Sequence, residues 1–511
     1  MRRVYVCVAA LCALAFASPA SAFERPSPGA AGIGDRLFPT LGNGGYDVQH
    51  YDLDLRYATS APSQSIDGTV TILAKATQSL SRFNLDFAGD SIGAVAVNGR
   101  SAAWRRVDEE LVITPRHHLD KGRLFVVRVS HFKATPTEPG GELGSTAFFT
   151  TPDGSATAPQ PDLAHDYFPC NDHPRDKASY SFRIDIPSDE VAVANGFPVA
   201  RRTHGGRTVW TYVQRQPMAS ELLQVAVGKF DLIDQGRHRG VPLRDVVAPS
   251  LRELVEPALP LEPGQLDYMI DRVGRYPFDI FGTLVVDAEL GFALETQTIS
   301  LLDRIWFTEF TQDVWDPTML HELSHMWFGD SVSPYSWSDL WLNEGHASWY
   351  EFLYAEGRGQ LAGDTEGYPD DTGYATMEEL MRAVYAHGDQ WRQDDGPVAR
   401  PLNPDVLFNF QRYHGGALVL YALRQKIGNA KFARLEREWV SRYRDDVAST
   451  DDFIALASKV SGRDLRSFLR AWVYGTKTPP MPGHPDWTVD PVRPPAPALT
   501  IARSPRGRPI P

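Results

Sequence analysis

The sequence predicts an α+β protein, with an antiparallel sheet in its first half and mostly helices in its second half. Residues 51–57 and 180–186 each alternate apolar with polar side chains, which is typical of half-buried strands. After about residue 250 the apolar residues follow helical spacing, and capping residues stand between the runs. With 511 residues, of which 42% are hydrophobic, the chain can bury a sizeable core and form at least two domains.

The first 22 residues have the pattern of a cleaved export signal. Arg2 and Arg3 are followed by an apolar run from Val4 to about Phe16, and small residues up to Ala22 suit a signal peptidase. The apolar run is shorter than the roughly 18–20 residues of a transmembrane helix. We therefore expect the mature chain to be exported, either secreted or periplasmic, without stable membrane insertion.

The charge and the cysteines of the mature chain limit its function further. The formal net charge is −13, and loss of residues 1–22 would remove two arginines and make it more negative. Such an acidic chain is not expected to bind nucleic acid. Cys170 is the only cysteine beyond the signal, so the mature chain has no disulfide of its own and depends on core packing and on any bound metal.

The predicted sheet domain covers residues 23–250. Besides the two alternating runs, the dipeptide Asn98-Gly99 follows a short apolar run, and this pair is a strong signal for a tight hairpin turn.

The predicted helical domain covers residues 251–485. Asp316 and Pro317 are expected to cap and start its central helix, and Gly329 to close it. A second helix is expected to begin near Ser338 and Asp339. Further helices are predicted at 413–429 and, with a capping box, at 449–462. The proline-rich residues 486–511 are expected to form a disordered tail.

The central helix carries the pattern H-E-x-x-H at residues 321–325. Positions i and i+4 lie on one face of a helix, so His321 and His325 can direct ring nitrogens at one metal ion. Glu322 lies beside them and can act on a water molecule at that ion. This arrangement is typical of zinc hydrolases, in which the metal polarises a carbonyl and the glutamate takes a proton from water.

Glu344 is the expected third ligand, because the glycine and proline between residues 326 and 340 allow the second helix to fold back on the first. Two neutral histidines and one carboxylate leave an open position on a single zinc ion per chain. His346 lies about 200° round that helix from Glu344 and is expected to point elsewhere.

These residues resemble the aminopeptidase N-like zinc metallopeptidases, the gluzincins of peptidase family M-one, which also include the leukotriene-epoxide hydrolase. The family signature has eighteen residues between H-E-x-x-H and the glutamate of W-L-N-E-G, and residues 326–343 are eighteen. The segments GYDVQHYDLDLRY, YFPCNDHPRDKASYSF and AWVYGTKTPP extend the resemblance over nearly the whole mature chain. It implies a saddle-like sheet domain followed by a thermolysin-like catalytic domain. Many members continue into further domains, whereas here only the proline-rich segment follows the predicted catalytic domain. We therefore expect a compact two-domain form with a more open cleft.

The resemblance also implies three further site residues. Glu295 in GFALETQT matches the family glutamate that holds the free amino group of the substrate, and Gln160 matches a second amine-binding position in the sheet domain. Tyr413 matches a tyrosine that stabilises the oxyanion. Thr296 stands where the family has asparagine, and Gly415 where it has lysine.

The sequence therefore predicts an exported zinc aminopeptidase that removes N-terminal residues from peptides. His321, His325 and Glu344 are the expected zinc ligands, Glu322 is the general base, Tyr413 stabilises the oxyanion, and Glu295 with Gln160 holds the ammonium group. The alternatives are a thermolysin-like zinc endopeptidase, an epoxide hydrolase at the same zinc, and a binding protein on an inactive peptidase scaffold. The sequence carries no signal for the oligomeric state or for the preferred N-terminal residue.

Overall fold

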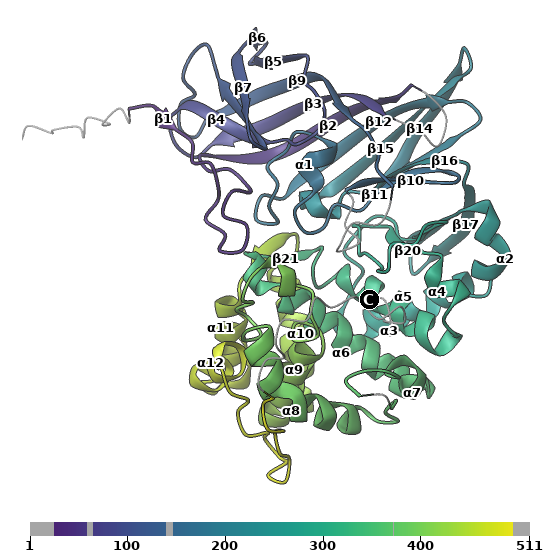
Figure 1. The fold of residues 1–511 in the computed structure, drawn as a ribbon, viewed down its shortest axis with the longest axis vertical. Helices are drawn as coiled ribbons and strands as arrows, with labels where there is room; N and C mark the ends of the chain where they lie inside the picture. Colours follow the sequence, from purple (N-terminus) through teal and green to yellow (C-terminus); the bar gives the residue numbers. More distant parts are fainter. Residues whose placement is uncertain (1–24, 59–64, 139–146, 371, 494–511) are drawn as a thin grey trace, which may run out of the picture.

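Most strands lie in one part of the molecule and most helices in another (Figure 1). The computed structural model describes residues 25–58, 65–138, 147–370 and 372–493. The sheet-rich part comes first in the chain and the helical part follows, so the predicted α+β fold class is confirmed. The predicted export signal, residues 1–22, lies outside the described residues.

An eight-stranded sheet forms most of the sheet-rich part. In spatial order its strands are β14 (Phe197–His204), β15 (Arg207–Met218), β12 (Ala178–Pro187), β2 (Tyr46–Tyr57), β3 (Ile66–Ala76), β9 (Leu124–Ala134), β5 (Ala94–Val97) and β6 (Arg100–Ser101). All neighbours pair antiparallel except β12 and β2, which are parallel. The parallel pair departs from the predicted antiparallel sheet, and the long chain between these two strands makes the crossover possible.

The alternating runs lie in β2 and β12, two neighbouring strands inside this sheet. Tyr51, Leu53 and Leu55 of β2 are buried, while the residues between them are exposed. Asn98 and Gly99 join β5 to β6 with φ of 50° and 73°, and two positive φ values are the mark of a type I′ turn. Both predictions are confirmed.

The described residues also form three four-stranded sheets. Their spatial orders are β1 (Ser27–Pro28), β4 (Leu80–Asp86), β8 (Glu110–Thr114), β7 (Ala103–Val107); β10 (Phe148–Thr151), β11 (Gly154–Thr157), β16 (Val225–Gly228), β13 (Val191–Ala194); and β17 (Asp231–His238), β18 (Val241–Val247), β19 (Thr283–Val286), β20 (Ser300–Asp303). The last sheet joins strands from both sides of residue 250, so the domain boundary that we predict there falls within one continuous sheet.

The helical part is built from eight longer helices. They are α3 (Glu262–Val273), α5 (Gln312–His325), α6 (Trp341–Arg358), α8 (Met377–Asp394), α9 (His414–Ile427), α10 (Asn429–Arg442), α11 (Thr450–Ser461) and α12 (Arg466–Tyr474). The short elements are α1 (Ala164–Tyr167), α2 (Arg252–Val255), α4 (Ile305–Thr308), α7 (Leu361–Asp364), β21 (Val332–Pro334) and β22 (Asp446–Ala448). Among the described residues no helix is long and apolar enough to span a membrane.

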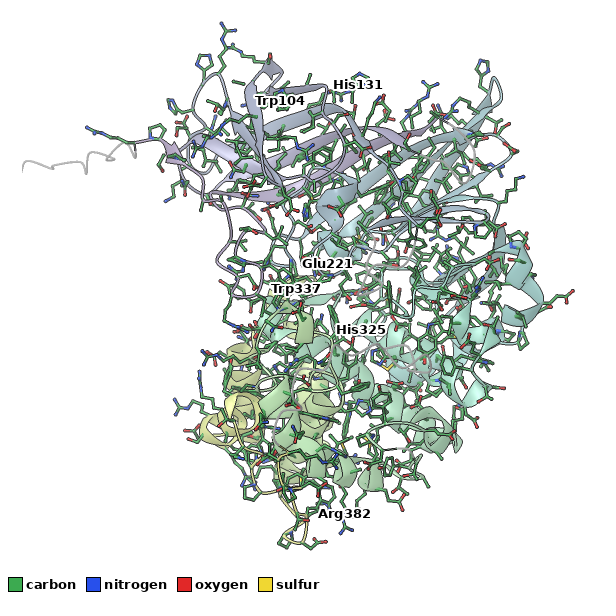
Figure 2. The ribbon with its side chains drawn as sticks, in the orientation of Figure 1. Trp104, His131, Glu221, His325, Trp337 and Arg382 are labelled. Carbon is green, nitrogen blue, oxygen red and sulfur yellow. The ribbon has the colours of Figure 1, made fainter. Side chains whose placement is uncertain are left out.

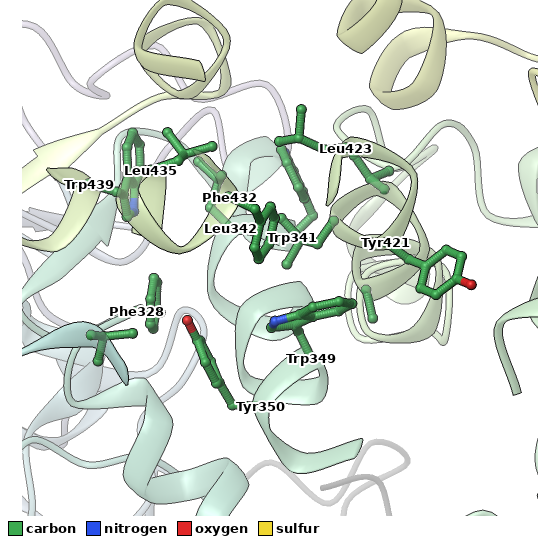
Figure 3. Close-up of a cluster of buried hydrophobic side chains, with 14 of the residues drawn as sticks. Phe328, Trp341, Leu342, Trp349, Tyr350, Tyr421, Leu423, Phe432, Leu435 and Trp439 are labelled. Carbon is green, nitrogen blue, oxygen red and sulfur yellow. The ribbon is translucent and has the colours of Figure 1, made fainter. Parts of the chain in front are cut away.

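Large aromatic side chains fill the core between these helices (Figure 3). Trp341 and Trp349 of α6 pack with Trp439 of α10 and with aliphatic residues of α9 in one buried cluster. This core holds α6 between α5 and α9 and therefore fixes the helices that carry the site.

The start of the central helix differs from the prediction. Helix α5 begins at Gln312 after Thr311, and Pro317 lies inside it. Asp316 is not a cap: its buried carboxylate accepts hydrogen bonds from Gln265 and Tyr354. The N-cap prediction is wrong here because the Asp316 carboxylate binds residues from other parts of the chain. The helix also ends at His325, before Gly329.

The predicted tail is wrong for its first residues. Trp487 is buried, and its ring stacks on that of Tyr421 with a centroid distance of 5.9 Å. The backbone N–H of Asp490 donates to Ala386 O at 2.9 Å. Residues 486–493 therefore pack on α8 and α9, because one tryptophan buries enough apolar surface to hold them. Residues 494–511 lie outside the described residues.

Candidate metal centre

Three side chains from two helices meet at one point in the helical part. His321 and His325 lie one turn apart on α5, and Glu344 lies in the first turn of α6. Glu344 Oε2 is 3.4 Å from the Nε2 atom of each histidine. All three side chains are buried, and among the described residues they are the one group with metal-ligand spacing. His325 lies just inside the helical part, below the junction with the sheets (Figure 2).

The spacing of these atoms fits zinc. Two ligands about 2.0–2.1 Å from a tetrahedral ion lie about 3.3–3.4 Å from each other, which matches both separations. His321 Nε2 and Glu344 Oε2 also have no hydrogen-bond partner, although both atoms are buried. Buried polar atoms without partners are costly, and a bound cation would satisfy both of them.

The other ring nitrogen of each histidine has a partner that fixes the ring. His321 Nδ1 is 2.7 Å from Glu351 Oε2, and His325 Nδ1 is 3.0 Å from Phe328 O. Both partners are acceptors, so each Nδ1 carries the proton and each Nε2 is left to bind metal. Glu351 was missed in the sequence. Glu351 is seven residues after Glu344 and lies on the same face of α6, so helix periodicity could have indicated that its carboxylate is near the site.

Carboxylates surround the two histidines and change their protonation in the absence of metal. Burial alone would lower the pKa of His325, but the charges of Glu295 and Glu344 outweigh it and raise the pKa to about 9. Burial would raise the pKa of Glu344, but the two histidines lower it below its usual value. Glu344 is thus an anion suited to binding a cation.

Glu322 lies next to His321 in the sequence and is not part of the group with metal-ligand spacing. It is buried, and its Oε2 atom has no hydrogen-bond partner. Burial raises its pKa to about 8, although His321 and His325 act in the opposite direction. Such a carboxylate can take up and release a proton near neutral pH.

Tyr413 reaches the same point from the start of α9. Its ring stacks on the ring of His321 with centroids 5.9 Å apart. Burial raises the pKa of the phenol well above its usual value, and the charge of Glu344 adds to the effect. The hydroxyl therefore stays protonated and can donate a hydrogen bond.

Two glycines, Gly345 on α6 and Gly416 on α9, allow the backbones of these helices to lie close together. A Cβ atom on Gly416 would lie 2.7 Å from the Cα of Gly345, which real side chains do not tolerate. Gly415, which stands where the family has lysine, lies against the side chain of Gln411. A side chain at this position would require the buried amide of Gln411 to move.

The two expected amine-binding residues are in direct contact. Gln160, just before α1 in the sheet-rich part, donates from Nε2 to Glu295 Oε1 at 2.7 Å. Glu295 lies in the segment between β19 and β20, and its charge affects the pKa of His325. The structure therefore brings together residues that are 135 positions apart in the sequence.

The segment that carries Glu295 is held from both sides. The Thr296 hydroxyl donates to Ile299 O within the segment, and its Oγ1 atom also lies 3.2 Å from Gln224 Oε1. Thr298 has a φ of 75°, a conformation that β-branched residues rarely adopt, and its Oγ1 accepts from Gly196 N at 2.8 Å.

His346 faces away from the metal-ligand atoms. Its Nδ1 atom is 2.7 Å from Leu342 O, and its ring stacks on that of Phe328 at 4.4 Å.

Family models recognise both parts of the chain. The peptidase family M1 domain matches residues 291–472, and the peptidase M1 N-terminal domain matches residues 144–222. The chain belongs to peptidase family M1. The first match contains His321, His325, Glu344 and Tyr413, and the second contains Gln160.

Similar M1 proteins include plant, animal and bacterial aminopeptidases. Aminopeptidase M1-B of Oryza sativa subsp. japonica is 26% identical over 318 residues, which are 60% of this chain and 35% of that protein. Glutamyl aminopeptidase of Mus musculus is 27% identical, over 69% of this chain and 37% of that protein. Aminopeptidase N of Streptomyces lividans is 27% identical, over 58% and 35%. The chain thus spans about a third of the length of these curated relatives.

Solved M1 structures match over a larger share of their length. The M1 zinc metallopeptidase from Deinococcus radiodurans superimposes with a TM-score of 0.74 and 28% identity, over 88% of this chain and 99% of that one. A mutant of that enzyme bound to a Tyr-Ser-Ala substrate matches with a TM-score of 0.73 and 28% identity, over 89% of this chain and 100% of that one. Another mutant structure is described as a two-domain enzyme bound to L-arginine.

Proposed function

We propose that this chain is an exported zinc aminopeptidase that removes N-terminal residues from peptides, with one zinc ion per chain. The observation that carries the proposal is the contact between Gln160 and Glu295 beside the buried group His321, His325 and Glu344. A metal-ligand group alone fits many hydrolases. The additional buried carboxylate, held in place by an amide from the other part of the molecule, fits a substrate with a free ammonium group.

His321, His325 and Glu344 would hold the zinc. When bound, the ion supplies Lewis-acid polarisation of the scissile carbonyl and lowers the pKa of a water molecule. Glu322 takes the proton from the attacking water and later gives it to the leaving amine, since it is buried beside the proposed ligands and its Oε2 atom has no hydrogen-bond partner. Tyr413 donates a hydrogen bond to the developing oxyanion.

Glu295 and Gln160 restrict the reaction to the end of the peptide. The ammonium group of the substrate would pair with the Glu295 carboxylate, which Gln160 orients. An acetylated or internal residue would leave this carboxylate buried without a cation, and such a mismatch is costly. A thermolysin-like endopeptidase would have no need of this pair.

Support for these assignments comes from two further sources. Relatives named aminopeptidases, and a related enzyme bound to a Tyr-Ser-Ala substrate, support a peptide with a free N-terminus. The basic, apolar and small-residue pattern of residues 1–22 supports export. The acidic net charge of −13 gives no reason to add nucleic acid as a partner.

The test is to measure zinc content and hydrolysis of aminoacyl amides, each with and without an N-acetyl group, by the mature protein. We expect hydrolysis of the free-amine substrates only. Glu322→Gln should retain zinc and lose activity by about 10²–10⁴-fold. Glu309→Gln, at an exposed glutamate after α4, is the matched control and should behave as wild type.

The same experiment can refute the proposal. Cleavage of acetylated substrates or of internal bonds would show that Glu295 is not an amine anchor and would favour the endopeptidase. Failure to bind zinc would favour a binding protein on an inactive scaffold. The substrate panel also measures the preferred N-terminal residue.

A further inference from the structure

A short segment near the start of the described chain crosses from the sheet-rich part to the helical part. Residues 33–41, here called the strap, form a closed loop in which Ile33 N donates to Leu41 O and Leu41 N donates to Phe38 O. On one side the strap contacts residues 171–175, which lie between α1 and β12. On the other side it contacts two segments of the helical part.

Asp35 joins all of these segments. Its Oδ1 atom accepts from the N–H groups of Leu37 at 2.7 Å and Phe38 at 3.3 Å, which shapes the strap itself. Its Oδ2 atom accepts from Trp337 N at 2.9 Å in the helical part and lies 3.1 Å from His173 Nε2 in the sheet-rich part. The side chains of Asp35 and His173 are both 0% exposed.

The proton of His173 can be assigned from its second contact. His173 Nδ1 accepts from Arg175 N at 3.0 Å, so it carries no hydrogen, and Nε2–H donates to Asp35. The two oxygens of Asp35 thus accept four hydrogen bonds from three segments. These donors lower the pKa of Asp35 to about 2, although burial acts in the opposite direction.

Apolar side chains of the strap pack on the helical part. Leu37, Phe38 and Leu41 form a separate buried cluster with Trp337, Leu340 and Leu407. The rings of Phe38 and Trp337 meet edge to face with centroids 5.9 Å apart. Trp337 lies at the junction of the two parts (Figure 2). Arg36 adds hydrogen bonds to Pro401 O and Leu402 O.

The two segments that the strap joins lead directly into the proposed site. The turn Trp337–Asp339 runs through Leu340 into α6, whose first turn carries Glu344. Leu407 lies six residues before Tyr413 at the start of α9. The strap therefore contacts the segment that precedes Glu344 and the segment that precedes Tyr413.

Given the function proposed above, we propose that the strap sets the position of Glu344 relative to Tyr413, with Asp35 as its positioning residue. Asp35 touches neither substrate nor metal. It acts by holding the turn before α6 and the cluster before α9 against the sheet-rich part. A shift of α6 by a fraction of an ångström would disturb the 3.4 Å spacing between Glu344 and the histidines.

The decisive variant is Asp35→Asn in the full chain. An asparagine can offer only one acceptor oxygen, so its NH₂ group would face N–H donors on one side. We expect Co²⁺, bound in place of zinc, to dissociate about tenfold faster into excess chelator and to show a changed visible absorption spectrum. In the metal-free protein, backbone amides of 337–345 and 407–416 should exchange hydrogen faster than in wild type.

Two control variants separate positioning from general destabilisation. Val129→Ala creates a cavity in the sheet core and lowers stability without touching the strap. Thr40→Ala alters an exposed strap residue. Both should keep the wild-type Co²⁺ spectrum and the wild-type exchange in the two segments. If Asp35→Asn does not fold, Phe38→Leu replaces it as a milder change in the same cluster.

The outcomes distinguish this inference from the proposed function. If Asp35→Asn matches Val129→Ala in both the Co²⁺ spectrum and the exchange, the strap holds the fold but does not position the site, and the inference fails. If the wild type binds no metal, the proposed function fails, and the exchange of the two segments in the metal-free protein still decides the role of the strap.

Discussion

At the scale of single residues, Glu351 determines which nitrogen of His321 is available to a metal ion. Its carboxylate lies 2.7 Å from His321 Nδ1 and is buried behind the ligand. Such partners orient the ring and strengthen it as a ligand. The zinc affinity of the site should therefore depend on a residue that does not touch the zinc.

Replacing Glu351 with alanine should weaken zinc binding by about 10–100-fold. Glu351→Gln, which keeps an acceptor oxygen, should have a smaller effect. Competition with a chelator measures both affinities. Glu366→Ala, at an exposed glutamate after α7, is the control. Equal affinities in Glu351→Ala and wild type would show that His321 needs no such partner.

Asp35 predicts a pH dependence of stability. Its pKa of about 2 in the folded protein is below the usual 3.8, so its contribution is fully present above about pH 4 and is lost as the pH falls toward 2. At pH 7 the contribution is roughly 2 kcal/mol. Urea unfolding of wild type and Asp35→Asn should show this gap at pH 7 and a smaller one at pH 3. A gap that does not change with pH would contradict the assignment.

The grouping of His321, His325 and Glu344 could be predicted from the sequence, whereas the environment of Asp35 could not. His321, His325 and Glu344 follow from helix periodicity and from the spacing of the motif. Asp35 and Trp337 are 302 positions apart, and no local pattern connects them. Contacts of this kind depend on how two distant parts of the chain meet.

At the scale of elements, the crossing of α6 and α9 explains why Glu344 and Tyr413 lie close together. The helices touch through Gly345 and Gly416, where any side chain would force them apart. At this crossing the two backbones are in contact directly, because neither glycine has a side chain.

Gly416→Ala should separate the two helices and cost about 1–3 kcal/mol of stability. Because Tyr413 directly precedes α9, we expect kcat for free-amine substrates to fall more than KM changes. Steady-state kinetics and thermal unfolding test this. Gly357→Ala, at a position on α6 with open space around it, is the control and should be tolerated or slightly stabilising. An unchanged kcat in Gly416→Ala would mean that α9 can move without affecting the site.

Sequence patterns predicted most elements, and the exceptions have physical causes. The hairpin at Asn98-Gly99 and the capping box at Ser449 depend on local geometry and were predicted correctly. The predicted start of α5 was wrong because Asp316 accepts hydrogen bonds from Gln265 and Tyr354. The predicted start of the disordered tail was wrong because Trp487 packs on Tyr421. In each case a long-range partner decided the outcome.

At the scale of the whole molecule, the metal should hold the two central helices of the helical part together. Without it, the cluster of imidazole and carboxylate groups between α5 and α6 is buried with unpartnered atoms. Binding energy at such a site adds to the stability of the folded state.

Removing zinc with a chelator should lower the melting temperature of the protein, and adding zinc back should restore it. Zinc at a thousandfold excess over Kd adds about 4 kcal/mol. Calorimetry of wild type, Glu322→Gln and Glu344→Ala tests this. The first two should respond to zinc, and the third should not. A zinc response in Glu344→Ala would place the stabilising metal elsewhere.

The strap also has a consequence for the order of events during synthesis. Asp35 leaves the ribosome 302 residues before its partner Trp337. At about 5–20 residues per second this is a delay of roughly 15–60 s. The sheet-rich part can fold during that interval, but its connection to the helices must wait. The contact between Asp35 and Trp337, which holds the turn before α6, can therefore form only after the whole sheet-rich part has been made.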